Sequence, residues 1–139
     1  MDQYLIDGIP VNIYASLTEA SEHIIENYVG RTSSAVAINP EKLMLARNEA
    51  KIRAVLLANE VRYSDGIGVV KLLEKKSGKP VVRIPGCELW ENLMKLSGEK
   101  NIPVFLVGAS AEVLNNTIDK LITVCATNIV GHSDGYFTN

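Results

Sequence analysis

Several residue types are scarce in this sequence, and each scarcity narrows the possible classes of protein. The 139-residue chain has a formal net charge of −2, so its charge gives no reason to expect nucleic acid as a partner. Its only two cysteines, Cys87 and Cys125, are not in a CxxC spacing, which fits reduced thiols rather than a disulfide framework. His23 and His132 lie far apart without ligand-spaced partners, so a zinc site is not expected.

Long apolar segments are also missing. No apolar run approaches the roughly 18 residues that a membrane crossing requires. The opening stretch MDQYLIDGIPV lacks the basic and long apolar regions of a signal peptide.

With 47% hydrophobic and 22% charged residues, the composition is that of a folded globular protein. A chain of this length is expected to form a single domain, residues 1–139, around one buried core.

Short apolar runs and helical patterns alternate along the chain. Asp7-Gly8, between two β-prone runs, predicts an N-terminal β-hairpin. Further short runs bounded by polar, glycine or proline residues predict strands at residues 33–39, 61–64, 81–84, 103–108 and 127–131. The segments between them carry apolar residues at helical spacing, which predicts a helix in each interval.

Strands that alternate with helices of about 10–15 residues predict βαβ crossovers. The expected fold class is therefore α/β: a Rossmann-like parallel sheet with helices on both faces and an N-terminal β-hairpin. Ligands of such sheets bind beyond the carboxyl ends of the strands. The residues that follow successive strands are Asn39-Pro40, Asp65-Gly66, Pro85-Gly86, Gly108-Ala109-Ser110 and Gly131-His132. Glycines and helix N-termini at this edge favour a nucleotide or another phosphorylated ligand.

Most of these positions also have an interpretation that needs no ligand. Asp65 is either the N-cap of the helix that follows it or a carboxylate that can accept a proton. Arg83 is either a solvated edge-strand residue or a cation facing a diphosphate, and Gly108-Ala109-Ser110 is either a plain turn or a phosphate cradle. Gly66-Ile67-Gly68 begins like a dinucleotide fingerprint, but Lys71 replaces its third glycine, which disfavours an NAD-dependent oxidoreductase. No DxD pair is present, so a divalent cation bridged by two close aspartates is not expected. No other cofactor is predicted.

Several blocks of sequence, in matching order and spacing, resemble the WecG/TagA/CpsF glycosyltransferase family over most of the chain. They are AINPEKLMLAR (37–47), DGIGVV (65–70), RIPGCEL (83–89), VFLVGAS (104–110) and IVGHSDGYF (129–137). DGIGVV followed by the arginine-to-glycine block is the most specific part, and the likeness is greatest to the TagA type. The resemblance implies a Rossmann-like α/β fold, which agrees with the pattern above, and an enzyme that works without a metal.

The resemblance implies an inverting sugar transferase, cytoplasmic and peripheral at the inner face of the bacterial cell membrane. Its donor would be UDP-N-acetylmannosamine, and its acceptor would be N-acetylglucosamine on undecaprenyl diphosphate. In the TagA type this step makes the linkage disaccharide of wall teichoic acid. The resemblance also implies a homo-oligomer. The alternative is a non-catalytic module that binds a nucleotide or a sugar phosphate, as an inactive variant of the family would.

The resemblance further implies roles for individual residues. Asp65 matches the aspartate proposed as general base, which would take the proton from the acceptor 4-hydroxyl, and Arg83 would neutralise charge on the departing UDP. The implied substrate-binding positions are Ala37, Asn39, Gly66, Gly86, Gly108, Ala109, Ser110, Gly131 and Tyr136.

Two features depart from the family pattern. The family usually has threonine two residues before the asparagine of the N-P-E block, whereas this chain has Ala37, a change expected to weaken or abolish transfer. Family members also continue beyond the GYF block with further strands and a membrane-targeting portion. The chain, which ends at Asn139, is therefore expected to lack the C-terminal part of the full-length protein.

Overall fold

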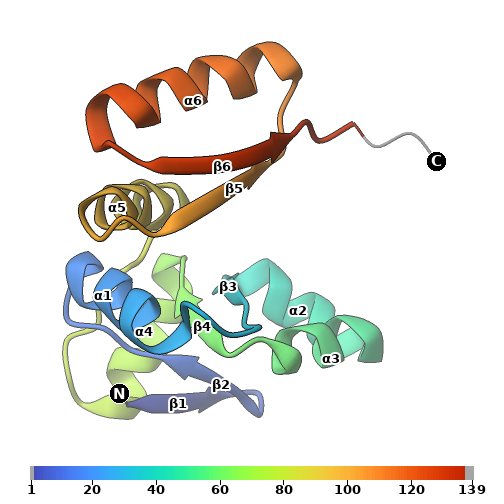
Figure 1. The fold of residues 1–139 in the computed structure, drawn as a ribbon. Coiled ribbons are helices and arrows are strands. Elements are labelled where there is room, and N and C mark those ends of the chain that lie inside the picture. Colours follow the sequence, from blue (N-terminus) through green and yellow to red (C-terminus); the bar gives the residue numbers. More distant parts are fainter. Residues whose placement is uncertain (1, 137–139) are drawn as a thin grey trace. The chain divides into compact units, whose positions relative to one another are not determined.

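The computed structural model describes residues 2–136, which form two units (Figure 1). The N-terminal unit comprises the described residues up to Trp90, and the C-terminal unit comprises those from Glu91 onward. Helix α5 (Gly86–Glu99) begins in the first unit and continues into the second.

A four-stranded sheet in the order β1-β2-β4-β3 forms the centre of the N-terminal unit. Its strands are β1 (Gln3–Ile6), β2 (Ile9–Asn12), β3 (Ala35–Ile38) and β4 (Val61–Ser64). Strands β1 and β2 form the predicted antiparallel hairpin, whereas β4 pairs in parallel with both β2 and β3. Asp7 and Gly8 both have positive φ, at 51° and 75°, as the tight two-residue hairpin turn requires. The hairpin prediction is confirmed.

Four helices flank this sheet, and side-chain caps mark the start of two of them. The helices are α1 (Leu17–Tyr28), α2 (Pro40–Asn48), α3 (Ala50–Ala58) and α4 (Ile67–Ser77). The Ser16 hydroxyl accepts the Glu19 N–H at the start of α1, and the Asn39 side chain accepts the Lys42 N–H at 2.9 Å at the start of α2. Both caps join residues three positions apart, as a Ser or Asn N-cap does.

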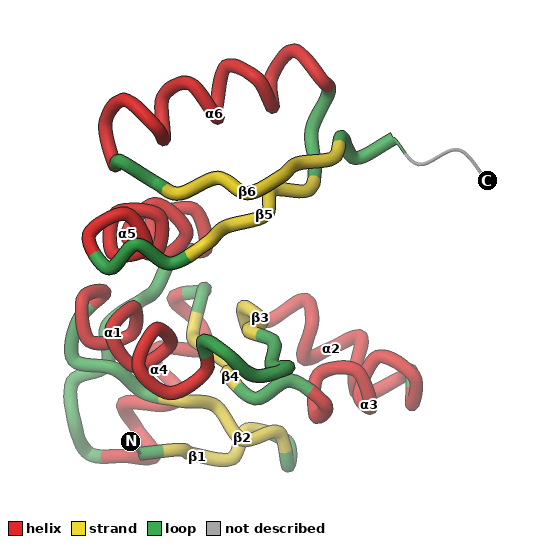
Figure 2. The backbone as a smooth tube through the Cα atoms, viewed as in Figure 1, coloured by secondary structure: helices red, strands yellow, loops and turns green. Residues whose placement is uncertain are grey.

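The strand predicted at residues 81–84 is wrong. This segment belongs to the connection between α4 and α5, drawn as a loop in Figure 2. Its backbone N–H groups donate to three different residues: Val81 to the Glu74 carboxylate at 3.3 Å, Val82 to the Tyr14 carbonyl at 3.4 Å and Ile84 to the Ser64 carbonyl at 2.8 Å. Because no single strand receives these bonds, the apolar segment forms no ladder.

The C-terminal unit contains a two-stranded parallel sheet of β5 (Pro103–Val107) and β6 (Asn128–Ser133), connected by α6 (Ala111–Cys125). In Figure 1, α6 runs alongside this pair of strands. The core of the C-terminal unit contains buried residues from α5, β5 and α6, namely Met94, Leu106, Leu114 and Leu121. The α/β class, the mostly parallel pairing, the flanking helices and the N-terminal hairpin are confirmed, with the strands divided between two sheets.

Candidate functional site

Asp65 lies directly after β4, at the carboxyl end of this parallel strand. Its N–H donates to the Ile38 carbonyl at 2.9 Å, which continues the pairing of β3 and β4 by one residue. Gly66 then starts α4 as its N-cap, without a side-chain capping bond. The Asp65 side chain is 25% exposed, so it is held by the fold and still accessible to a ligand.

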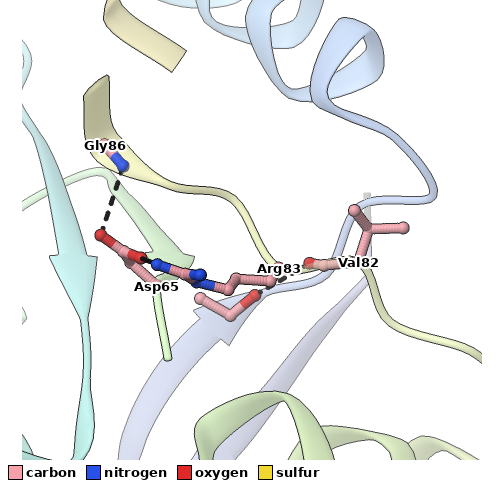
Figure 3. A network of polar contacts seen from close by, with 5 residues as sticks. Asp65, Val82, Arg83 and Gly86 are labelled. Atoms are coloured by element: carbon pink, nitrogen blue, oxygen red, sulfur yellow. Dashed lines mark hydrogen bonds and ion pairs between the residues drawn. The ribbon is translucent and has the colours of Figure 1, made fainter. Parts of the chain in front are cut away.

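Both carboxylate oxygens of Asp65 have partners far away in the sequence (Figure 3). Oδ1 accepts from the Arg83 guanidinium, at 3.2 Å from Nη2 and 3.3 Å from Nε. Oδ2 accepts the backbone N–H of Gly86, the first residue of α5, at 3.2 Å. The interpretation of Asp65 as the N-cap of its own helix is therefore wrong, because its carboxylate meets the start of a different helix.

Arg83 is positioned by backbone contacts on either side of it. The Ser64 hydroxyl donates to the carbonyl of Val82, labelled in Figure 3, at 3.2 Å. The Ile84 N–H donates back to the Ser64 carbonyl at 2.8 Å. The side chain of Arg83 remains 55% exposed. A guanidinium has five N–H donors, and only those on Nε and Nη2 contact Asp65. The remaining donors are available to an anionic ligand.

Gly66 brings the predicted residues of the N-P-E block next to Asp65. A Cβ at Gly66 would lie 3.0 Å from Cδ of Pro40 and 3.5 Å from Cβ of Asn39, so a side chain here would push α2 away. Ala37 lies on β3, with its carbonyl accepting from Nζ of Lys42 at 2.9 Å. The predicted site residues of this unit therefore gather around the ends of β3 and β4.

The glycine turns of the C-terminal unit also come together. Gly108 donates its N–H to the Ser133 carbonyl at 3.0 Å, and Gly135 donates to the Ala109 carbonyl at 2.9 Å. Gly108 and Ala109 have positive φ, 135° and 58°. Ser110 caps α6 by accepting the Val113 N–H at 3.4 Å. The structure thus joins the predicted segment 108–110 to the turn after β6.

The two other predicted residues of this unit differ in what surrounds them. Gly131 pairs with Phe105, and a Cβ on this glycine would lie 2.6 Å from the phenyl ring, so packing alone accounts for it. Tyr136 is exposed, and its N–H donates to the Asp134 carboxylate at 3.0 Å. Phe137, the last residue of the block IVGHSDGYF, lies outside the described residues.

A cavity of about 310 Å³ lies beside these turns, at the N-terminal end of α6. It is lined by Ala111, Leu114, Asn115, His132, Ser133 and Asp134. Asn115 and Asp134 were not predicted as site residues, and His132 was named only as a residue that follows a strand, without a binding role. Two sequence signals could have indicated these residues. His132 and Asp134 are two positions apart, so their side chains lie on the same side of an extended chain, and Asn115 lies near the start of the helix that Ser110 caps.

Tyr63 was also not predicted as a site residue. It lies on β4 two residues before Asp65 and is buried, with 9% of its surface exposed. Burial is the larger cause that raises the pKa of its phenol, and the negative charge of Asp65 raises it further.

Asp65 and Arg83 belong to the N-terminal unit, whereas Gly108–Ser110 belongs to the C-terminal unit. A cleft that both groups of residues share therefore stays a prediction.

A parallel strand of the N-terminal unit ends in a partly exposed carboxylate paired with an arginine, and a parallel strand of the C-terminal unit ends in a glycine turn. The carboxyl ends of parallel strands are where α/β proteins bind their ligands. Comparison with protein families narrows this class further: the model of the glycosyl transferase WecG/TagA/CpsF family matches residues 4–139. The chain belongs to this family, and glycosyl transfer is the activity that this membership supports. None of the helices within residues 2–136 combines the length and apolar character that a membrane crossing requires.

Proposed function

We propose that the protein is an inverting glycosyltransferase of wall teichoic acid synthesis. It moves N-acetylmannosamine from UDP-N-acetylmannosamine to the 4-hydroxyl of N-acetylglucosamine on a polyprenyl diphosphate. Family membership supports glycosyl transfer, and the observation that carries the mechanism is the Asp65 carboxylate held between Arg83 and Gly86. TagA-type specificity rests on the resemblance of the sequence blocks alone.

Asp65 is the general base in this mechanism. As the acceptor 4-hydroxyl oxygen bonds to the anomeric carbon, its proton passes to the carboxylate and the bond from that carbon to UDP breaks. The two carboxylate oxygens offer about four lone-pair directions. Three N–H contacts, from Arg83 and Gly86, leave room for one more donor. Such assistance is worth about 10²–10⁴ in rate, or roughly 3–5 kcal/mol.

Arg83 stabilises the departing diphosphate. Before reaction its positive charge faces Oδ1 of Asp65 at 3.2 Å. Proton transfer neutralises this carboxylate at the same time as negative charge develops on UDP, so the guanidinium can exchange one anionic partner for the other. A preorganised cation aimed at developing charge is a major source of rate acceleration.

The remaining parts of the proposal concern the partners. The turn of Gly108–Ser110 and the segment Gly131–Tyr136, which runs from within β6 into the turn after it, are proposed to bind the UDP portion of the donor with their neighbouring cavity. The supporting geometry is a helix N-terminus with glycines, which suits phosphate. Because the acceptor is anchored in lipid, the protein is proposed to work peripherally at the inner face of the cell membrane. It is also proposed to act as a homo-oligomer.

Transfer from UDP-N-acetylmannosamine to a short-chain analogue of the lipid-linked acceptor tests the proposal. UDP release and the anomeric configuration of the product are measured for the parent, Asp65→Asn and the control Asp119→Asn on α6. Asp65→Asn is expected to lower kcat by about 10²–10⁴ while the control stays within about twofold. A rate for Asp65→Asn within about twofold of the parent would remove Asp65 from the mechanism.

A second candidate function is favoured by Ala37, which replaces the threonine expected from the family resemblance. It is a non-catalytic module that binds a nucleotide or a sugar phosphate. UDP binding to the parent, seen as a rise in melting temperature without any transfer, would support this module. A comparison with NAD in the same assay distinguishes both functions from an oxidoreductase.

A further inference from the structure

The hydroxyl of Tyr63 borders the same small space as the carboxylate of Asp65. The absence of a side chain at Gly86 creates this space. A Cβ on this glycine would lie 3.2 Å from the Tyr63 hydroxyl oxygen and 3.8 Å from Oδ2 of Asp65. Three groups from the end of β4 and the start of α5 therefore meet there: a phenol, a carboxylate oxygen and a backbone N–H.

The Tyr63 hydroxyl has no hydrogen-bond partner within residues 2–136. Tyr63 itself is buried, with 9% of its surface exposed. Its ring is therefore packed in the fold, while its O–H group is a donor that no group within residues 2–136 uses.

The protonation state of this phenol suits a donor. Burial first, and then the nearby charge of Asp65, raises the pKa of Tyr63 above its ordinary value of 10.0. The O–H group is therefore protonated at neutral pH. It can donate a hydrogen bond to an oxygen of a bound molecule.

The surroundings of Asp65 differ between its two oxygens. Oδ1 accepts from the cationic guanidinium of Arg83, whereas Oδ2 accepts from the neutral N–H of Gly86, the residue beside which the Tyr63 hydroxyl also lies. The Arg83 side is complementary to a diphosphate and the opposite side to an uncharged sugar. We propose that Tyr63 is an acceptor-binding residue, whose hydroxyl donates to a neutral oxygen of the sugar that Asp65 deprotonates.

This inference rests on the proposed glycosyl transfer and adds a residue to its acceptor site. Tyr63→Phe keeps the ring and removes only the hydroxyl. It is expected to raise the KM for the acceptor analogue about 3- to 10-fold, as for loss of one neutral hydrogen bond, and to leave the KM for the UDP-sugar unchanged. Tyr4→Phe, a partly buried tyrosine of β1, is the matched control.

Gly86→Ala is a second, independent variant, because its methyl group would lie 3.2 Å from the Tyr63 hydroxyl oxygen. It is expected to displace the hydroxyl and raise the acceptor KM in the parent background. In the Tyr63→Phe background the methyl group has room, so the two changes together are expected to have no more effect than either alone. Independent, multiplicative effects would contradict a shared role.

Direct binding separates failure of this inference from failure of the proposed function. The dissociation constant of the acceptor analogue is measured by calorimetry for the parent, Tyr63→Phe and Tyr4→Phe, with thermal unfolding to confirm the fold. Weaker binding confined to Tyr63→Phe supports the inference even where no transfer is seen. The inference is overturned if all three proteins bind the analogue equally or if the parent does not bind it. In either case, transfer by the parent would still support the proposed glycosyltransferase function.

Discussion

The carboxylate of Asp65 accepts the backbone N–H of Gly86 at 3.2 Å, across 21 residues of sequence. Because Gly86 is the first residue of α5, the carboxylate satisfies one of the unpaired N–H groups of that helix and lies at the positive end of its dipole. The proposed base is therefore also a capping group. Its chemistry and the start of α5 depend on the same side chain.

This double role predicts a difference between two substitutions at position 65. Asp65→Ala removes both the charge and the capping oxygen, and is expected to lower the free energy of unfolding by about 0.5–2 kcal/mol. Asp65→Asn retains an oxygen that can accept the Gly86 N–H, so its loss of stability is expected to be smaller. Urea unfolding of both variants measures the difference, and equal losses would contradict the capping role.

Arg83→Lys is expected to reduce transfer although it preserves the positive charge. The Nε and Nη2 donors of Arg83 both contact Oδ1 of Asp65, and a lysine ammonium cannot reproduce this planar pair. We expect kcat to fall by about tenfold for Arg83→Lys and by about 10²-fold or more for Arg83→Gln. Arg47→Lys, in the exposed ion pair with Asp7, is the control that should leave kcat unchanged.

Ala37→Thr is expected to increase transfer. Ala37 is the register partner of Tyr63 in the parallel pairing of β3 and β4, so the two side chains share a face of the sheet. A hydroxyl at position 37 would add one hydrogen-bonding group there, and a gain of about tenfold in kcat/KM is expected. Ala37→Val has the shape of threonine without the hydroxyl. An equal gain for both variants would assign the effect to packing.

The ion pair between Asp2 and Lys79, at 2.8 Å, is expected to respond to pH at both extremes. The hydrogen bond from Lys79, followed by its charge, lowers the pKa of Asp2 below 3.8, and the same contact raises the pKa of Lys79 above 10.5. The contribution of Asp2 to stability is present above its unfolded pKa and lost as pH falls through its folded value. That of Lys79 is present below its unfolded pKa and lost as pH rises through its folded value.

Lys79→Met tests this coupling through the pKa of Asp2. The pKa is expected to rise toward 3.8 in the variant, as measured by NMR titration of the carboxyl carbon. Lys95→Met on α5 is the control and should leave the titration unchanged. Because both partners are exposed, added salt should reduce the shift in the parent, and a titration insensitive to Lys79→Met would contradict the pairing.

Gly98→Ala is expected to destabilise the C-terminal unit. In an isolated helix this change would be favourable by about 1 kcal/mol, because alanine is the better helix former. Here a Cβ on Gly98 would lie 1.8 Å from the Cys125 carbonyl oxygen, so α5 and the end of α6 would have to separate. A loss of about 1–3 kcal/mol is expected in urea unfolding. Asn116→Ala, at an exposed site on α6, should show no such loss.

Local interactions made several elements predictable from the sequence. Ser16 and Asn39 each accept an N–H three residues away, and Asp7-Gly8 determines its own hairpin turn. These contacts need only neighbouring residues, so their residue types suffice to predict them. The family resemblance of the sequence blocks was confirmed for residues 4–139.

The tertiary structure decided which groups surround the candidate base. Residues 81–84 have the composition of a strand but divide their hydrogen bonds among Glu74, Tyr14 and Ser64. Asp65 meets Arg83 and Gly86 instead of capping α4. Such partners depend on how distant segments are packed side by side. A sequence pattern specifies which groups can form hydrogen bonds, whereas the packing of the chain selects which of them actually meet.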